Sequence, residues 1–132
     1  MDSTDRSLDL IRRWVDAVND RDIDSLLEVA HEEILCRPLS VGGGGGTYIG
    51  HDGLRRWIGR LSPDLHVRCD TIRPLEGGLV GAFGVLLVRE RVASPWALVA
   101  SVRDGKVSAA QSYFSDEHTL ATLGLLGEEP PD

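Results

Sequence analysis

Few residues of this chain could carry out acid–base chemistry. Glu90 and Asp70 are the carboxylates that the predicted strands make most available. If the connection from Val92 to Pro95 is a four-residue hairpin, Glu90 lies opposite Ala97, on the inner face of the sheet. A carboxylate there could abstract a proton or activate a water molecule. The prediction depends on strand register, because a slip of one residue turns the side chain outward.

Arg37 is a second candidate, next to Pro38 in a short apolar segment. A guanidinium that is buried without a partner destabilises the fold, so an acidic group must neutralise it there. Three interpretations stay open. Arg37 could form a structural pair with Glu33 or Glu90 or reach the rim, it could clamp a ligand carboxylate, or it could take part in catalysis.

The cysteines and histidines do not form a metal-binding pattern. Cys36 and Cys69 lie on separate apolar segments and are predicted to be buried thiols. The four histidines never fall near a cysteine at the spacing that a zinc site needs. We therefore expect no metal and no cofactor. The glycine run at 42–46 is not a phosphate loop, because no Gly-Lys-Ser/Thr follows it.

Apolar periodicity indicates the helices that would position these residues. The first helix begins at a cap among residues 3–5 and ends at Asn19-Asp20, and the second is capped by Asp22 or Asp24. A third helix is predicted over 51–61 and a short last one over 116–123. The glycine run between the second and third helices predicts a mobile loop.

Strands dominate the second half of the chain. A short extended segment at 34–39 precedes the third helix, and the period then changes to that of strands. The Asp104-Gly105 pair is the strongest turn signal, because it supplies the positive φ angles of a two-residue hairpin. Antiparallel strands that bury one face on helices give an α+β fold. Long strands are predicted at 65–75, 79–92, 96–103 and 106–115.

Composition and charge exclude several classes of protein. The 132 residues suit one domain, predicted over 1–127 with a disordered acidic tail at 128–132. The formal net charge of −7 repels phosphate backbones, so we expect no nucleic-acid partner. The longest apolar run is too short to span a membrane, and the N-terminus does not resemble a signal peptide. We therefore expect a cytoplasmic protein without a membrane partner.

Several segments together resemble a known family. Residues 14–27 (WVDAVNDRDIDSLL) and 48–57 (YIGHDGLRRW) resemble the helical hairpin and the loop into the third helix of SnoaL-like proteins, within the nuclear transport factor 2-like superfamily. Residues 103–107, 113–115 and 120–125 resemble their last hairpin and closing segment. The resemblance covers about residues 5–126. It implies a cone-shaped curved antiparallel sheet around three N-terminal helices, a short C-terminal helix, a ligand-sized pocket, and homodimers that pair through the sheet.

The resemblance alone does not give a reaction, because the family contains polyketide cyclases, ketosteroid isomerases, epoxide hydrolases and non-catalytic modules. Ketosteroid isomerases need a tyrosine donor, an aspartate base and a protonated aspartate. The matching positions hold Trp14, Arg37 and Val99. The chain is therefore not expected to be a ketosteroid isomerase of the known type.

A mostly apolar pocket is the site that the resemblance implies. Its wall would bind a small hydrophobic ligand, with or without an acidic group. Trp14 and Trp57 also fit a hydrophobic core, and Trp96 is assigned to a dimer interface. Two hypotheses remain: an enzyme that uses Glu90 for proton transfer or water activation, and a non-catalytic ligand-binding or dimerisation module. The predicted wall comprises Trp14, Arg37, Tyr48, Trp57, Val99, Ala110, Ser112 and Phe114.

Overall fold

The computed structural model describes residues 3–38 and 46–124. Most of the predicted glycine loop and the whole of the predicted acidic tail lie outside the described residues. The elements follow in the order α1 (Ser3–Asp20), α2 (Ile23–Val29), β1 (Ala30–Arg37), β2 (Tyr48–Ile49), α3 (Gly50–Arg60), β3 (Leu65–Pro74), a 3-10 turn (Glu76–Gly78), β4 (Val80–Val88), β5 (Arg91–Arg103), β6 (Lys106–Tyr113) and α4 (Glu117–Thr122).

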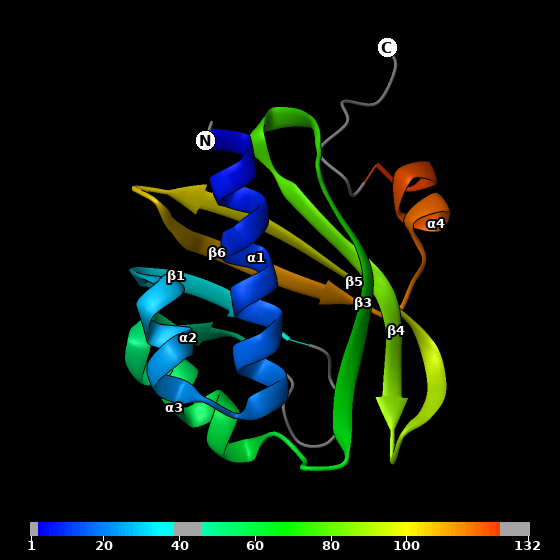
Figure 1. Cartoon of the computed structure of the whole chain (residues 1–132), viewed down its shortest axis with the longest axis horizontal. Helices are drawn as coiled ribbons and strands as arrows, with labels where there is room; N and C mark the ends of the chain where they lie inside the picture. The colour runs from blue at the N-terminus through cyan, green and yellow to red at the C-terminus, as the bar shows by residue number, and fades with distance from the viewer. Residues whose placement is uncertain (1–2, 39–45, 125–132) are drawn as a thin grey trace.

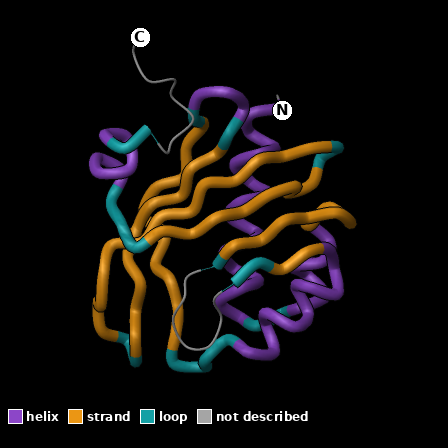
Figure 2. Tube along the Cα trace, turned by 180° about the vertical axis from the view of Figure 1, so that it is seen from behind, coloured by secondary structure: helices purple, strands orange, loops and turns teal. Residues whose placement is uncertain are grey.

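The six strands form one curved sheet in the order β2-β1-β6-β5-β4-β3 (Figures 1 and 2). Neighbouring strands are antiparallel except β1 and β6, which run parallel, so the sheet is mixed rather than wholly antiparallel as predicted. Helices α1 to α3 pack on one face, which we name the inner face, and α4 packs on the opposite, outer face. The fold is therefore α+β, with a curved sheet around the N-terminal helices as expected.

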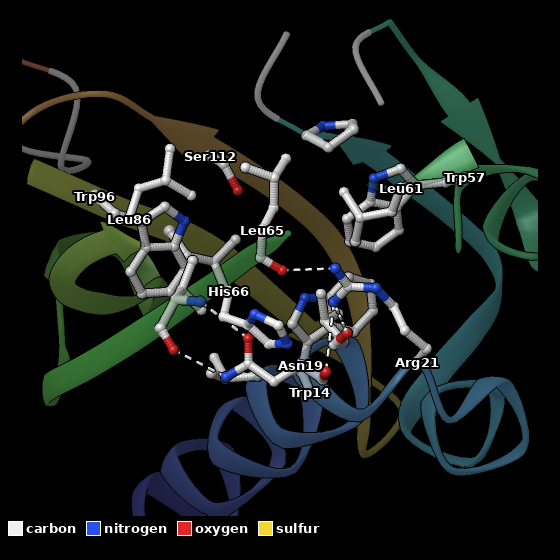
Figure 3. Close-up of a pocket in the computed structure, with 15 residues that line it drawn as sticks. Trp14, Asn19, Arg21, Trp57, Leu61, Leu65, His66, Leu86, Trp96 and Ser112 are labelled. Carbon is white, nitrogen blue, oxygen red and sulfur yellow. Dashed lines mark hydrogen bonds between the residues drawn. The ribbon is translucent and has the colours of Figure 1, made fainter. Parts of the chain in front are cut away.

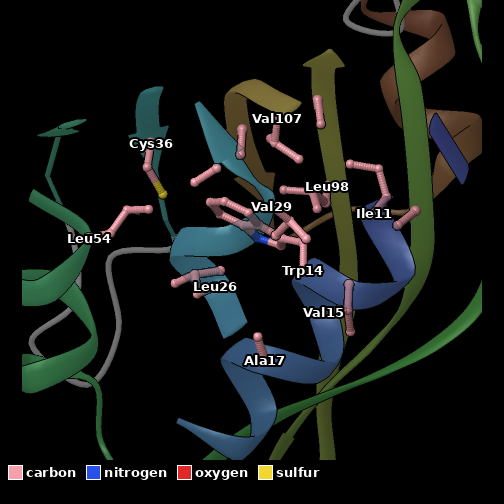
Figure 4. Close-up of a cluster of buried hydrophobic side chains, with 14 of the residues drawn as sticks. Ile11, Trp14, Val15, Ala17, Leu26, Val29, Cys36, Leu54, Leu98 and Val107 are labelled. Atoms are coloured by element: carbon pink, nitrogen blue, oxygen red, sulfur yellow. The ribbon is translucent and has the colours of Figure 1, made fainter. Parts of the chain in front are cut away.

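The hydrophobic core lies between α1, α2 and the inner face (Figure 4). Ile11 and Trp14 recur on one side of α1, as a 3.6-residue period requires, and both are buried against the sheet. Leu26 from α2 and Leu98 from β5 complete the contact. Full burial of each such aliphatic side chain stabilises the fold by about 2 kcal/mol.

Two aspartates begin short helices. Asp22 caps α2, and its carboxylate accepts hydrogen bonds from the Ser25 hydroxyl and backbone N–H, which lower the pKa of Asp22. Asp116 caps α4 by accepting from the Thr119 backbone N–H, which lowers the pKa of Asp116. The structure thus selects Asp22 rather than Asp24 as the cap of the second helix.

The β4–β5 hairpin turns earlier than predicted. Arg89 and Glu90 form the turn, with φ angles of 50° and 69°, and no glycine or asparagine marks it. The predicted breaker, Pro95, lies inside β5. It is tolerated there because β6 ends at Tyr113, which pairs with Ala97, so Pro95 has a strand neighbour only on the β4 side.

The register of β5 on β6 also differs from the prediction by one residue. Val99 pairs with Gln111 instead of Ala110, and Leu98 pairs with Ser112. The cause is an irregularity after the Asp104-Gly105 hairpin, where Ser108 is the extra residue on β6. Counting from the turn misses this bulge, and every side chain beyond it changes face.

No helix in the described part of the chain is long and apolar enough to cross a membrane.

Gly84 of β4 should not tolerate a side chain, because a Cβ atom there would collide with the backbone carbonyl of Arg68 on β3. We expect Gly84→Ala to lower the free energy of unfolding by about 2 kcal/mol. Gly59 of α3 has open space around it, so Gly59→Ala should raise that free energy by about 0.5 kcal/mol. Urea denaturation of both variants tests this, and a Gly84→Ala protein as stable as wild type would contradict it.

Candidate functional site: a tryptophan-lined cavity

A half-open cavity, with about 60 Å³ of space inside it, lies between α1, α3 and the inner face of the sheet (Figure 3). We name it the tryptophan cavity. Its lining is predominantly apolar, with a few polar side chains from the end of α1 and from β3 and β6. The lining residues are Trp14, Val15, Val18, Asn19, Arg21, Pro38, Trp57, Leu61, Leu65, His66, Val67, Leu86, Trp96, Leu98 and Ser112.

All three tryptophans of the chain line this one cavity. Trp14 of α1 and Trp57 of α3 stack, with ring centroids 6.2 Å apart and an interplanar angle of 23°. Trp96 comes from β5 and lies with Leu86 on the other side of the cavity in Figure 3. Aromatic rings favour such offset stacking, so the cavity presents flat, polarisable walls from two layers of the fold.

Asn19 attaches the end of α1 to the edge strand β3. Its Nδ2 donates to the Val67 carbonyl at 2.8 Å, and its Oδ1 accepts from the Val67 N–H at 2.9 Å. The side-chain amide therefore pairs with the backbone much as a neighbouring strand would. This pair of hydrogen bonds holds the helix end and the strand on either side of the cavity.

Arg21 follows α1 in the left-handed conformation, with φ of 55°. Its Nη1 donates to the carbonyls of Val18 and Asn19, at 2.7 and 3.4 Å, and its Nη2 donates to the carbonyls of Ser62 and Leu65. Burial lowers the pKa of the guanidinium. Arg21 thus joins the carbonyls that end α1 to the segment that begins β3.

Three buried side-chain atoms in the described residues lack a hydrogen-bond partner: Arg21 Nε, Tyr48 Oη and Trp57 Nε1. Two of the three belong to residues that line the tryptophan cavity. A buried donor without a partner costs about 1–3 kcal/mol. An acceptor that reached one of these atoms would remove that cost.

The described lining of the cavity contains no carboxylate. His66, an exposed residue of β3, contributes an imidazole to the lining. No group of three or more His, Cys, Asp or Glu residues that could hold a metal occurs among residues 3–38 and 46–124. The site therefore combines aromatic walls with a few polar groups that carry no negative charge.

Residues 11–110 match the model of the SnoaL-like domain family. The chain belongs to the SnoaL-like family. A search of the curated proteins gives no match.

Solved structures with low sequence identity share the fold of this SnoaL-like chain. Bal32a from a soil-derived mobile gene cassette is 17% identical, with a TM-score of 0.74 over 87% of this chain and 93% of that one. TerC, co-crystallised with polyporic acid, is 21% identical, with a TM-score of 0.70 over 93% and 99%. A nuclear transport factor 2-like protein from Burkholderia xenovorans is 23% identical, with a TM-score of 0.65 over 93% and 95%.

The SnoaL-like fold brings some of the predicted wall residues together. Trp14, Trp57 and Ser112 line the tryptophan cavity. Ala110 is buried on the inner face and Tyr48 is buried in the core, both outside the cavity lining. Whether any of them binds a ligand stays a prediction.

Glu90 does not lie on the inner face. It is exposed in the β4–β5 turn, so the expectation that it points into the cone is wrong. The physical reason is the early turn, because Phe83 rather than Glu90 pairs with Ala97.

Arg37, Val99 and Phe114 also lie away from the tryptophan cavity. On β1 the buried Cys36 faces inward and the exposed Arg37 faces outward, where water solvates the charge. Phe114, just after β6, is 45% exposed. Arg37 and Val99 border a groove of about 120 Å³ on the other side of the sheet. This outer groove is lined by Leu35, Arg37, Leu79, Val99, Ala100, Ser101, Ala109, Ala110, Gln111 and Tyr113.

Sequence reasoning missed the polar residues of the site. In the sequence, Asn19 and Arg21 stand at the end of a predicted helix and His66 stands inside a predicted strand, and nothing distinguishes them from their neighbours. The contacts of Asn19 and Arg21 reach across more than forty positions of sequence, which no local pattern reveals. Trp96, predicted to lie at a dimer interface, is instead buried in the hydrophobic core on the inner face.

Asn19→Ala should lower the free energy of unfolding by about 1.5 kcal/mol, because the Val67 N–H and carbonyl lose their partners. Asp16→Ala is the control, since Asp16 is an exposed residue of the same helix. Amide hydrogen exchange should also become faster at Val67 in the Asn19→Ala protein. Unchanged exchange there would show that the amide does not clamp the strand.

Proposed function

We propose that this SnoaL-like domain binds a small, flat, apolar molecule in the tryptophan cavity. The proposal rests on the observation that all three tryptophans line one cavity. Ligand sites are typically concave and apolar, with a few placed polar groups, and this cavity has that composition. A planar ring between indoles gains stacking as well as burial of apolar surface.

The comparison with TerC supports a small organic ligand, because that protein of the same fold was co-crystallised with polyporic acid. Acid–base chemistry at Glu90 has no such support, since Glu90 lies in an exposed turn. Binding is therefore the function that the described geometry favours over the cyclase-, isomerase- or hydrolase-like alternatives. The apolar residues Leu61, Leu65 and Leu86 supply the rest of the contact surface.

A cavity-filling substitution tests this function. Ser112 lines the tryptophan cavity and its neighbour Gln111 faces the outer groove. Ser112→Leu should weaken binding of 2-methylnaphthalene at least about tenfold by occupying the space, whereas Gln111→Leu should change it less than about twofold. Tryptophan fluorescence measures both, because every tryptophan lies at the cavity. Equal binding by wild type and Ser112→Leu would contradict the proposed site.

We further propose a homodimer that pairs through the outer face of the sheet. Leu35, Val99 and Tyr113 are half-buried there, and α4 covers only part of that face. Burial of this surface against a second copy would remove apolar area from water.

Sedimentation should give about twice the chain mass of 14.4 kDa. Ala109→Arg, which places a charge in the outer groove, should give a monomer by leaving that charge buried without a partner. Asp16→Arg, on the exposed side of α1, should stay dimeric. A wild-type monomer at all concentrations would rule out the pairing.

A further inference from the structure

Two residues of the tryptophan cavity carry a hydrogen-bond donor that has no partner. Trp57 is 6% exposed, and its Nε1–H, which can only donate, has no partner. Arg21 uses its other nitrogens on four carbonyls, but its buried Nε–H is also without a partner. Two buried donors without a partner therefore belong to residues that line one cavity.

The acceptors near these donors are already engaged. The carbonyls of Val18, Ser62 and Leu65 accept from Arg21, and the Val67 carbonyl accepts from Asn19. The amide oxygen of Asn19 accepts from the Val67 N–H. The Ser112 hydroxyl and the imidazole of His66 can each donate as well as accept. The described cavity thus offers more to a ligand oxygen than to a ligand N–H group.

The guanidinium of Arg21 gives the site a positive charge, which, like the unpartnered donors, favours a ligand that carries negative charge. Arg21 forms no ion pair with a carboxylate in the part of the chain that the structure describes. The negative end of the α1 dipole offsets part of its charge, through the carbonyls of the last turn. This interaction engages Nη1 and leaves the Nε–H without a partner. A ligand oxygen that carries negative charge would gain most there, because charge-assisted hydrogen bonds are the stronger ones.

We infer that the ligand is a flat aromatic acid, whose ring lies among the indoles and whose anionic oxygens accept hydrogen bonds from Trp57 Nε1 and Arg21 Nε. Figure 3 shows Trp57 and Arg21 on the same side of the cavity, opposite Trp96. The inference rests on the proposed binding function and adds the chemical class of the ligand. It assigns the anion-reading role to Arg21, whereas the exposed Arg37 lies at the outer groove.

Three probes share a naphthalene ring and differ in the group attached to it, so they separate the contribution of the ring to binding from that of the attached group. These are 2-naphthoate, 2-methylnaphthalene and 2-naphthylmethylammonium, each titrated into the full chain by fluorescence. We expect 2-naphthoate to bind about tenfold more tightly than 2-methylnaphthalene, and the ammonium to bind most weakly.

Trp57→Phe removes the indole N–H and keeps an aromatic ring. It should reduce the preference for 2-naphthoate over 2-methylnaphthalene about fivefold. Trp96→Phe is the matched control, because Trp96 lines the same cavity but has no unpartnered buried nitrogen. It should weaken both probes alike and leave the preference unchanged. If Trp57→Phe does not fold, the wild-type preference decides alone.

The outcomes separate the two proposals. If 2-methylnaphthalene binds as tightly as 2-naphthoate, or the ammonium binds best, the aromatic acid is overturned and the binding function stands. An unchanged preference in folded Trp57→Phe also overturns the assigned contacts. If none of the probes binds, the binding function fails, and the class of ligand fails with it.

Discussion

The attachment of α1 to β3 is the constraint on which the rest of the site depends. Two hydrogen bonds between the Asn19 amide and the Val67 backbone fix the end of the helix at the edge of the sheet. Arg21, two residues later, ties the same helix end to the segment before β3. The polar contacts therefore set the position of the helix end that borders the cavity.

The same α1 serves both the core and the cavity. Ile11 packs fully into the core, whereas Trp14, one turn later, lies in the core and at the cavity wall. Stacking with Trp57 fixes the Trp14 ring from the side of α3. A rigid aromatic wall loses little conformational entropy when a ligand binds, because its rings are already ordered. The stacking of Trp14 on Trp57 thus both stabilises the fold and orders the cavity wall before a ligand binds.

Local patterns predicted much of this fold and only part of its site. The helices, their aspartate caps and the Asp104-Gly105 hairpin follow from periodicity and turn chemistry, which act over a few residues. The Arg89-Glu90 turn carries no glycine, and the bulge at Ser108 carries no marker, so strand faces beyond them were misjudged. Trp14 and Trp57 were predictable from helical spacing. Asn19 was not, because its partner is 48 positions away and is a backbone group that any residue possesses.

The Asn19 clamp has a consequence for the outer boundary of the sheet as well. β3 is an edge strand, and unpaired N–H and carbonyl groups on such a strand invite another chain to add to the sheet. At Val67 both backbone groups are occupied by an amide from the chain's own helix. A foreign strand that aligned with β3 would have to displace that amide before it could extend past this point. The residue that anchors the helix end beside the cavity therefore also occupies one point of the sheet edge at which a foreign strand would pair.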